Sequence, residues 1–144
     1  MDKDQLISQM KVALATSFSL YLKAHNYHWN VTGPNFAQYH DFFGDIYADV
    51  WGSIDTTAEE IRKLGSFVPG SLARYLEISK IEDEMNIPEA AVMIQRLAAD
   101  NDKLINILYL ARTTADNINA AGTLNYLEGR INIHEKHGWM LKSF

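Results

Sequence analysis

The chain has 144 residues, of which 47% are hydrophobic and 22% are charged, and its net charge is −5. This balance predicts one soluble domain over residues 1–144, and the acidic charge argues against a general attraction to nucleic acid or anionic lipid. The chain has no cysteine, so any metal must be held by His, Asp, Glu or water. No apolar run approaches the roughly 18 residues that cross a bilayer, and the polar start lacks a signal-peptide core, so we expect a cytoplasmic protein.

Apolar residues recur with helical spacing, and the breaks fall near the three prolines. The pattern predicts helices over roughly 5–29 and 36–64, separated by the turn Thr32-Gly33-Pro34-Asn35. A linker follows, with a short helix near 71–76.

A third helix is predicted from near Asn86, where Asn86-Ile87-Pro88-Glu89 resembles a capping box with proline in the first turn, and a fourth follows Gly122. No strand pattern competes, so the prediction is an all-α four-helix bundle with a short helix in the second-to-third helix linker. The residues predicted to face the core are Leu6, Met10, Ala13, Ser17, Leu20 and Ala24 in the first helix, Ala90, Ile94, Leu97, Asn101, Leu104, Leu108, Ala111 and Ala115 in the third, and Leu124, Leu127, Ile131, His134, Gly138 and Leu141 in the fourth.

Three of the five histidines, His25, His28 and His40, lie in the segment HNYHWNVTGPNFAQYH, on the two sides of the predicted turn. The turn brings the end of the first helix beside the start of the second, so His28 can join His40. His25 lies near a helix C-terminus, where it more simply complements the helix dipole.

On one face of the second predicted helix, possible metal ligands and small residues form a stripe about 120° wide. It runs through His40, the small residues Gly44, Ala48 and Gly52, and then Asp55 and Glu59. His40 and Asp55 lie roughly 22 Å apart along the axis, too far to share one metal ion within a chain. Two copies that cross antiparallel about a two-fold axis, packed at the small residues, would bring the His40 end of each to the Asp55 end of the other.

The predicted metal site therefore combines two imidazoles of one subunit, His28 and His40, with two carboxylates of its mate, Asp55 and Glu59. This donor set suits Fe(II), Mn or Zn better than Ca. No glutamate is followed three residues later by histidine, which argues against a diiron centre within one bundle and favours one between subunits.

Structural interpretations of the same residues stay open. Spacing alone does not separate a ligand role for His28 and His40 from a structural one, and the two carboxylates can also form a solvated face. His134 lies on the inner seam of the fourth helix, where a core histidine with satisfied hydrogen bonds is the simpler interpretation.

Several segments together resemble the Dps family, the miniferritins or DNA-binding proteins from starved cells. HNYHWNVTGPNFAQYHDFF is similar to the family signature around its ferroxidase histidines, and Asp55-Thr56-Thr57-Ala58-Glu59 matches its D-x-x-A-E segment. GSFVPGSLARYLEISKI is similar to the interhelical linker of the family, and HEKHGWMLKS resembles its closing helix.

The resemblance implies a ferritin-like bundle that assembles through two-fold dimers into a hollow dodecamer. It implies oxidation of Fe(II) at the dimer interfaces, preferentially by peroxide, storage of the ferric product, and protection against oxidative damage. The residues that match family ligands are His28, His40, Asp55 and Glu59.

The main departure from the family is Gly44, which stands where an acidic ligand is usual. Asp41 and Asp45 point about 100° and 140° away from the second histidine, so neither is an easy substitute. The site is therefore expected to hold one metal, to bind iron weakly, to prefer zinc, or to recruit His137 or His134. A second function follows from these options: a Dps-like metal-binding or structural cage with weak or no ferroxidase activity.

DNA-binding members of the family often carry a lysine-rich N-terminal tail. Here about five residues precede the first predicted helix, and Lys3 is the only cation among them. Because counterion release needs clustered cations, tight DNA binding is not expected. The expected partners are iron, peroxide and further copies of the chain.

Overall fold

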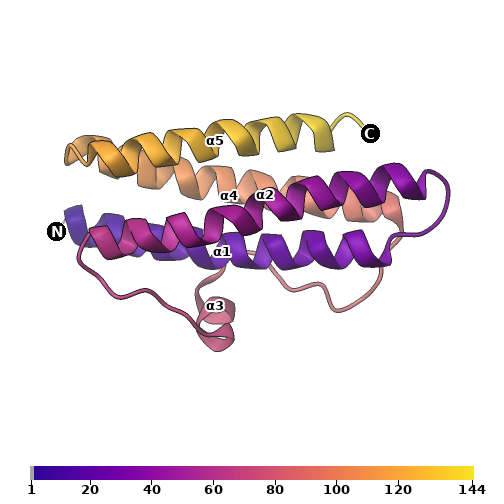
Figure 1. The fold of residues 1–144 in the computed structure, drawn as a ribbon, viewed down its shortest axis with the longest axis horizontal. Helices are drawn as coiled ribbons and strands as arrows, with labels where there is room; N and C mark the ends of the chain where they lie inside the picture. Colours follow the sequence, from indigo (N-terminus) through magenta and orange to yellow (C-terminus); the bar gives the residue numbers. More distant parts are fainter. Residues whose placement is uncertain (1) are drawn as a thin grey trace.

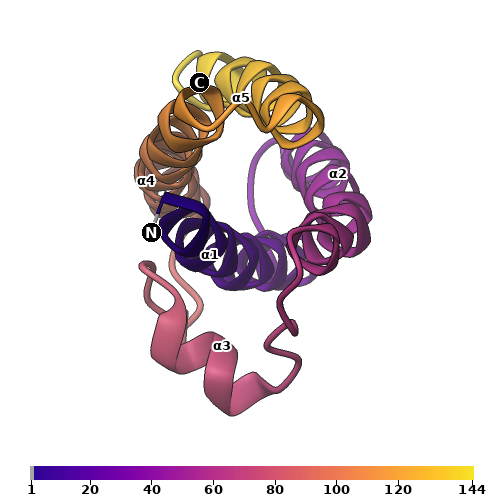
Figure 2. The same ribbon diagram turned by 90° about the vertical axis from the view of Figure 1, so that its left-hand side faces the viewer.

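The computed structural model describes residues 2–144, and every regular element among them is a helix. Four long helices form a bundle (Figure 1): α1 (Asp2–Asn30), α2 (Phe36–Lys63), α4 (Ala90–Asn117) and α5 (Ala121–Leu141). The short α3 (Leu72–Ile78) lies outside the bundle against α1 (Figure 2). The predicted all-α architecture is confirmed, and none of the helices described is long and apolar enough to span a membrane.

The turn between α1 and α2 determines how the two histidine-bearing helices meet. Gly33 and Asn35 have φ angles of 98° and 63°, a left-handed conformation that glycine adopts freely and asparagine tolerates. The Phe36 N–H donates to the Gly33 carbonyl oxygen at 3.1 Å and closes the turn. As predicted, α2 folds back along α1 and its first turns lie beside the end of α1.

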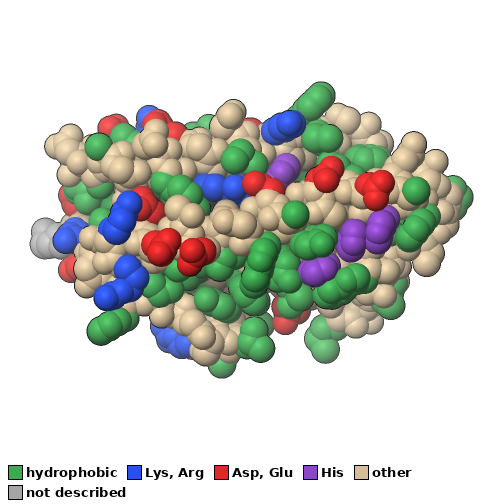
Figure 3. Space-filling model, in the orientation of Figure 1, with side chains coloured by type: hydrophobic (Ala, Val, Ile, Leu, Met, Phe, Trp, Pro, Cys, Tyr) green, Lys and Arg blue, Asp and Glu red, His purple; other side chains and the backbone are tan. Residues whose placement is uncertain are grey.

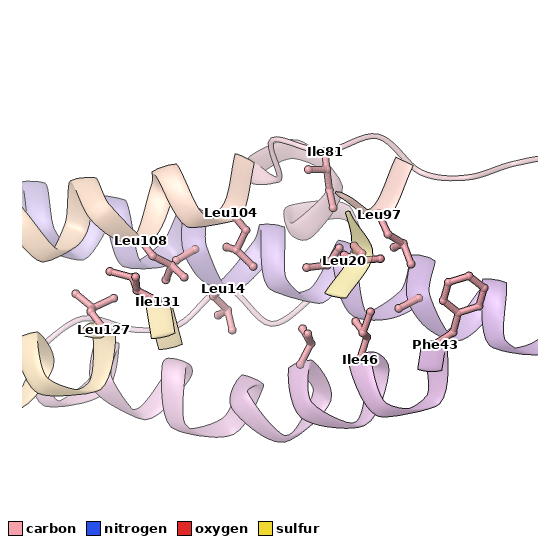
Figure 4. Close-up of a cluster of buried hydrophobic side chains, with 14 of the residues drawn as sticks. Leu14, Leu20, Phe43, Ile46, Ile81, Leu97, Leu104, Leu108, Leu127 and Ile131 are labelled. Carbon is pink, nitrogen blue, oxygen red and sulfur yellow. The ribbon is translucent and has the colours of Figure 1, made fainter. Parts of the chain in front are cut away.

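The predicted seams form the core of the bundle (Figure 4). All seam residues predicted for α1 are buried, and so are those for α4 and α5 apart from Ala90 and Leu124, which are half-buried. Side chains such as Leu20, Ile46 and Leu104 point inward from three different helices. Full burial of an aliphatic side chain contributes roughly 1.5–3 kcal/mol, so this core is the main favourable term that holds the helices together.

One carboxylate anchors the linker between α3 and α4. Glu84 accepts hydrogen bonds from the Tyr27 hydroxyl at 2.6 Å, from Arg96 at 2.5 Å and from the Asn86 N–H at 3.3 Å. Burial alone would raise the pKa of Glu84, but these bonds and the Arg96 charge lower it. The predicted capping box at Asn86 is wrong, because Glu84 engages that backbone and α4 begins only after Glu89.

Candidate metal centre

His28, near the end of α1, and His40, near the start of α2, lie against each other. Their imidazole rings stack with centroids 3.7 Å apart and 20° between the planes. Nδ1 of each ring lies 2.7 Å from the backbone carbonyl oxygen of the other residue. The structure therefore brings together the two histidines that the turn was predicted to join.

These reciprocal hydrogen bonds determine which nitrogen of each ring is available. A backbone carbonyl oxygen can only accept, so Nδ1 carries the proton in both His28 and His40. In the neutral rings, Nε2 then keeps its lone pair. A bond from Nδ1–H to a carbonyl is the arrangement that orients a metal-binding imidazole and raises its basicity. The pair is thus two oriented nitrogen donors that are only partly buried.

Gly44 makes room for one of these donors. A Cβ at this position would lie 3.2 Å from Nδ1 and 3.3 Å from Cε1 of His28, so the imidazole would have to shift by a few tenths of an ångström. Gly44 was predicted to serve close packing between two copies, and this stays a prediction; within its own chain, its nearest side chain is that of His28. The Cβ position of Gly52 has no atom within 4 Å and remains open to a neighbouring molecule.

Asp55 and Glu59 lie in the second half of α2, and both are exposed. The rise of an α-helix places Asp55 about 22 Å along the axis from His40. Within residues 2–144 of one chain, no three or more His, Asp or Glu side chains come together in a group that could hold a metal ion. One subunit therefore presents two imidazoles towards one end of α2 and two carboxylates towards the other.

His134 is a core histidine whose hydrogen bonds are satisfied. Its Nδ1 lies 2.9 Å from Asn101 Oδ1, and its Nε2 lies 2.9 Å from Arg130 Nη2. Arginine can only donate, so Nε2 accepts, and Nδ1 carries the proton that it donates to Asn101. Neither nitrogen keeps a lone pair for a metal in this arrangement, which confirms the structural interpretation of this residue.

His137 is the second histidine of α5, and its mostly buried side chain faces Asp49 of α2. Its Nε2 is 3.7 Å from Asp49 Oδ2, and its buried Nδ1 has no hydrogen-bond partner among residues 2–144. Arg130 engages the same carboxylate with two hydrogen bonds of 3.0 and 2.9 Å. Burial alone would raise the pKa of Asp49, but Arg130 lowers it. Burial lowers the pKa of His137, which lies beside the ion pair of Arg130 with Asp49 and is not grouped with His28 and His40.

The burial of His134 predicts a dependence of stability on pH. Burial, and then the charge of Arg130, lower the pKa of His134 to about 3. Below about pH 6.5 the unfolded chain gains a proton that the folded chain does not, so the free energy of unfolding should fall by about 2 kcal/mol between pH 7 and pH 5. Denaturant unfolding of the wild type and of His134→Gln at both values measures the loss. An equal loss in the two proteins would contradict the assignment to His134.

His25 belongs to an aromatic cluster that sequence reasoning missed. Trp29 and Tyr47 both stack on its ring with centroids 3.8 Å away, and the Tyr21 hydroxyl lies 3.0 Å from its Nδ1. Burial and the neighbouring His28 lower the pKa of His25. The missed signal was the spacing of Tyr21, His25 and Trp29 at four-residue intervals, which places them on one helix face. The predicted dipole role does not describe these contacts.

The histidines and the aromatic cluster share one face of the molecule. Figure 3 shows histidine side chains gathered among hydrophobic side chains over α1 and α2. On these helices Trp29 is 58% exposed, Trp51 is 54% exposed and Phe36 is 45% exposed. Exposed apolar area of this kind on a small protein commonly marks a site of protein association.

Comparisons with known proteins find relatives that match nearly the whole chain. Residues 7–144 match the family model of the ferritin-like domain. A DNA protection during starvation protein of Brevibacillus brevis is 38% identical over 125 residues, which cover 87% of this chain and 84% of the relative. The crystal structure of a Dps protein from Bacillus brevis matches with a TM-score of 0.95 at 34% identity, covering 99% of this chain and 96% of that chain.

A Dps protein from Vibrio cholerae O1, described as a member of a broad superfamily of ferritin-like diiron-carboxylate proteins, matches with a TM-score of 0.94 at 26% identity. The match covers 99% of this chain and 89% of that chain. The match to the family model over residues 7–144, the relative that is 38% identical and the solved Dps structures together show that the chain belongs to the Dps family of ferritin-like proteins.

Proposed function

We propose that this chain is the subunit of a cytoplasmic iron-detoxifying miniferritin. Fe(II) is its substrate, bound at sites that two subunits share and oxidised there with peroxide or dioxygen. The ferric product is stored inside a hollow dodecamer built from two-fold dimers. Membership of the Dps family supports the proposal, since the Vibrio cholerae relative is described as a ferritin-like diiron-carboxylate protein.

The observation that carries the proposal is the reciprocal bonding of His28 and His40. Each ring donates Nδ1–H to the other residue's carbonyl oxygen, which leaves two oriented Nε2 donors on a face rich in exposed aromatic side chains. Two nitrogen donors do not complete a metal site in one chain. A second copy would add the carboxylates of Asp55 and Glu59, which balance the charge that iron gains on oxidation.

Gly44 favours a site for one ferrous ion. The four proposed ligands match one tetrahedral or open octahedral ion, and glycine supplies no further donor. An acidic side chain at this position would also press on His28. The same observation supports the alternative function, a Dps-like cage that binds iron or zinc with weak or no ferroxidase activity.

The proposed partners are iron, peroxide and further copies of the chain. DNA is not among them, because the chain carries a net charge of −5 and binding to phosphates requires clustered cations.

Anaerobic addition of Fe(II) and then peroxide, followed by ferric absorbance, tests the proposed function. We expect the wild type to oxidise Fe(II) well above the buffer rate, and the variants His28→Ala and Asp55→Ala to fall to that rate because each removes a ligand. Asp41→Ala is the matched control, since Asp41 is another exposed aspartate of α2 outside the proposed site. A wild-type rate equal to buffer, with retained Fe(II) or Zn(II) binding, would instead support the alternative cage.

A further inference from the structure

A cluster of aromatic and imidazole rings adjoins the proposed iron site, and the function above does not require it. Trp29, His25 and Tyr47 form a stack in which both neighbours lie 3.8 Å from the His25 ring, at interplanar angles of 30° and 6°. Tyr21 lies 5.5 Å from His25 and 4.8 Å from Trp51 between ring centroids. These five residues are called the ring cluster below.

The ring cluster is in contact with a proposed iron ligand. The centroid of His28 lies 5.1 Å from that of Tyr47 and 5.9 Å from that of His25. Tyr21 is itself 6.2 Å from Tyr47. Electron tunnelling slows exponentially with the gap between donor and acceptor, and here each step joins neighbouring rings.

Tyr21 is the member of the ring cluster with a built-in proton acceptor. Its phenol oxygen lies 3.0 Å from His25 Nδ1, one helical turn further along α1. A phenol gives up an electron far more readily when its proton can move at the same time to a hydrogen-bonded base. With the His25 proton on Nε2, the phenol donates to Nδ1 and that base is in place. Tyr47 has no comparable hydrogen bond among the residues described.

The proposed iron site needs a second electron donor when it reacts with peroxide. Reduction of peroxide takes two electrons, and a single ferrous ion supplies one. We propose that Tyr21, hydrogen-bonded to His25, supplies the second electron when peroxide oxidises iron bound at His28. This inference rests on the proposed function and on a site that holds one ferrous ion.

The step balances in atoms, electrons and charge. Fe(II) gives one electron and becomes Fe(III), while the Tyr21 phenol gives one electron and becomes a neutral tyrosyl radical. Its proton passes to Nδ1 of His25, which becomes an imidazolium. Peroxide takes both electrons, its O–O bond breaks, and two hydroxide ions form. No hydroxyl radical is released, because the second electron arrives inside the protein.

Rapid freeze-quench electron paramagnetic resonance tests this step. Wild-type protein loaded anaerobically with one Fe(II) per subunit is mixed with peroxide, and the ferrous ions oxidised per peroxide consumed are counted in parallel. We expect a tyrosyl radical, identified by the change in its spectrum when tyrosine is ring-deuterated, and one ferrous ion oxidised per peroxide. In Tyr21→Phe we expect the radical to be lost and the ratio to rise to two, with Fe(II) oxidation retained.

Three further variants distinguish Tyr21 from its neighbours. His25→Phe keeps a ring in the stack but removes the proton acceptor, so the radical should be lost there too. Tyr47→Phe and the matched control Tyr39→Phe, which packs against Phe43 and Phe144 away from the ring cluster, should keep both the radical and the ratio of one. Retention of the radical in Tyr21→Phe, or its loss in Tyr47→Phe, would overturn the assignment.

Failure of the inference and failure of the proposed function give different results. Rapid wild-type oxidation with no radical and two ferrous ions per peroxide would overturn the role of Tyr21 alone. Wild-type oxidation no faster than in buffer would overturn the role of Tyr21 together with the ferroxidase function.

Discussion

Mixing subunits that carry His28→Ala with subunits that carry Asp55→Ala is expected to restore ferroxidase activity that neither variant has alone. In a dimer of unlike subunits, one proposed site receives both histidines from the Asp55→Ala chain and both carboxylates from the His28→Ala chain, so it is intact. The other site carries both defects. Random one-to-one mixing makes half of the dimers unlike, so about a quarter of all sites should be active.

The mixture is prepared by co-expression of the two variants with different tags and by purification through both tags. A second mixture, of His28→Ala with His40→Ala, serves as the matched control. Both of its defects lie in the nitrogen-donor half, so no pairing restores a complete site. Fe(II) oxidation in the first mixture but not the second is the expected result. Equal activity in the two mixtures, or full activity in the single variants, would contradict a site shared between subunits.

Among the substitutions proposed here, Lys23→Met is expected to lower the free energy of unfolding most. Lys23 on α1 and Asp100 on α4 form an ion pair with a separation of 2.7 Å, and their side chains are only 7% and 9% exposed. Lys23→Met leaves the Asp100 carboxylate buried without its partner, which typically costs about 3–5 kcal/mol. Thermal unfolding should show a fall in melting temperature on the order of 10 °C.

Two comparisons separate this effect from general disturbance of the helices. The double variant Lys23→Met/Asp100→Leu removes both charges and should recover most of the loss, because an apolar pair of similar size can replace a buried ion pair. Lys142→Met breaks the exposed pair between Lys142 and Asp102, whose side chains are 58% and 48% exposed, and should cost less than about 1 kcal/mol. A double variant as unstable as Lys23→Met would show that the buried pair is not the cause.

Much of the fold follows from the sequence by local rules. Helical spacing of apolar residues predicted four long helices and the core-facing seams. A repeat of apolar residues every 3.6 positions can be recognised in a stretch of only a few helical turns. The turn signal at Gly33 and Pro34 predicted that His28 and His40 would lie side by side. Glycine and proline favour a reversal of the chain there, and the reversal brings the two helix ends together. The prediction at Asn86 failed because Glu84 took up its backbone N–H instead.

Spacing also led to the hypothesis of which residues donate to the proposed site, although the same spacing permits structural roles for His28 and His40. Along α2, a fixed rise per residue separates His40 from Asp55 by about 22 Å, so a metal site that contains both residues is predicted to need a second subunit. Within residues 2–144 of one chain, no group of three or more possible ligands lies together, so the shared site stays a prediction.

Only the tertiary structure decided how individual side chains are used. It showed that Gly44 makes room for His28, that His134 has no free nitrogen, and that His25 lies in an aromatic stack beside Tyr21. The deciding partners are often remote in the chain: Arg130 pairs with Asp49 across 81 positions. A periodic pattern specifies which face of a helix is buried, but a hydrogen bond between helices depends on which side chains packing brings within about 3 Å.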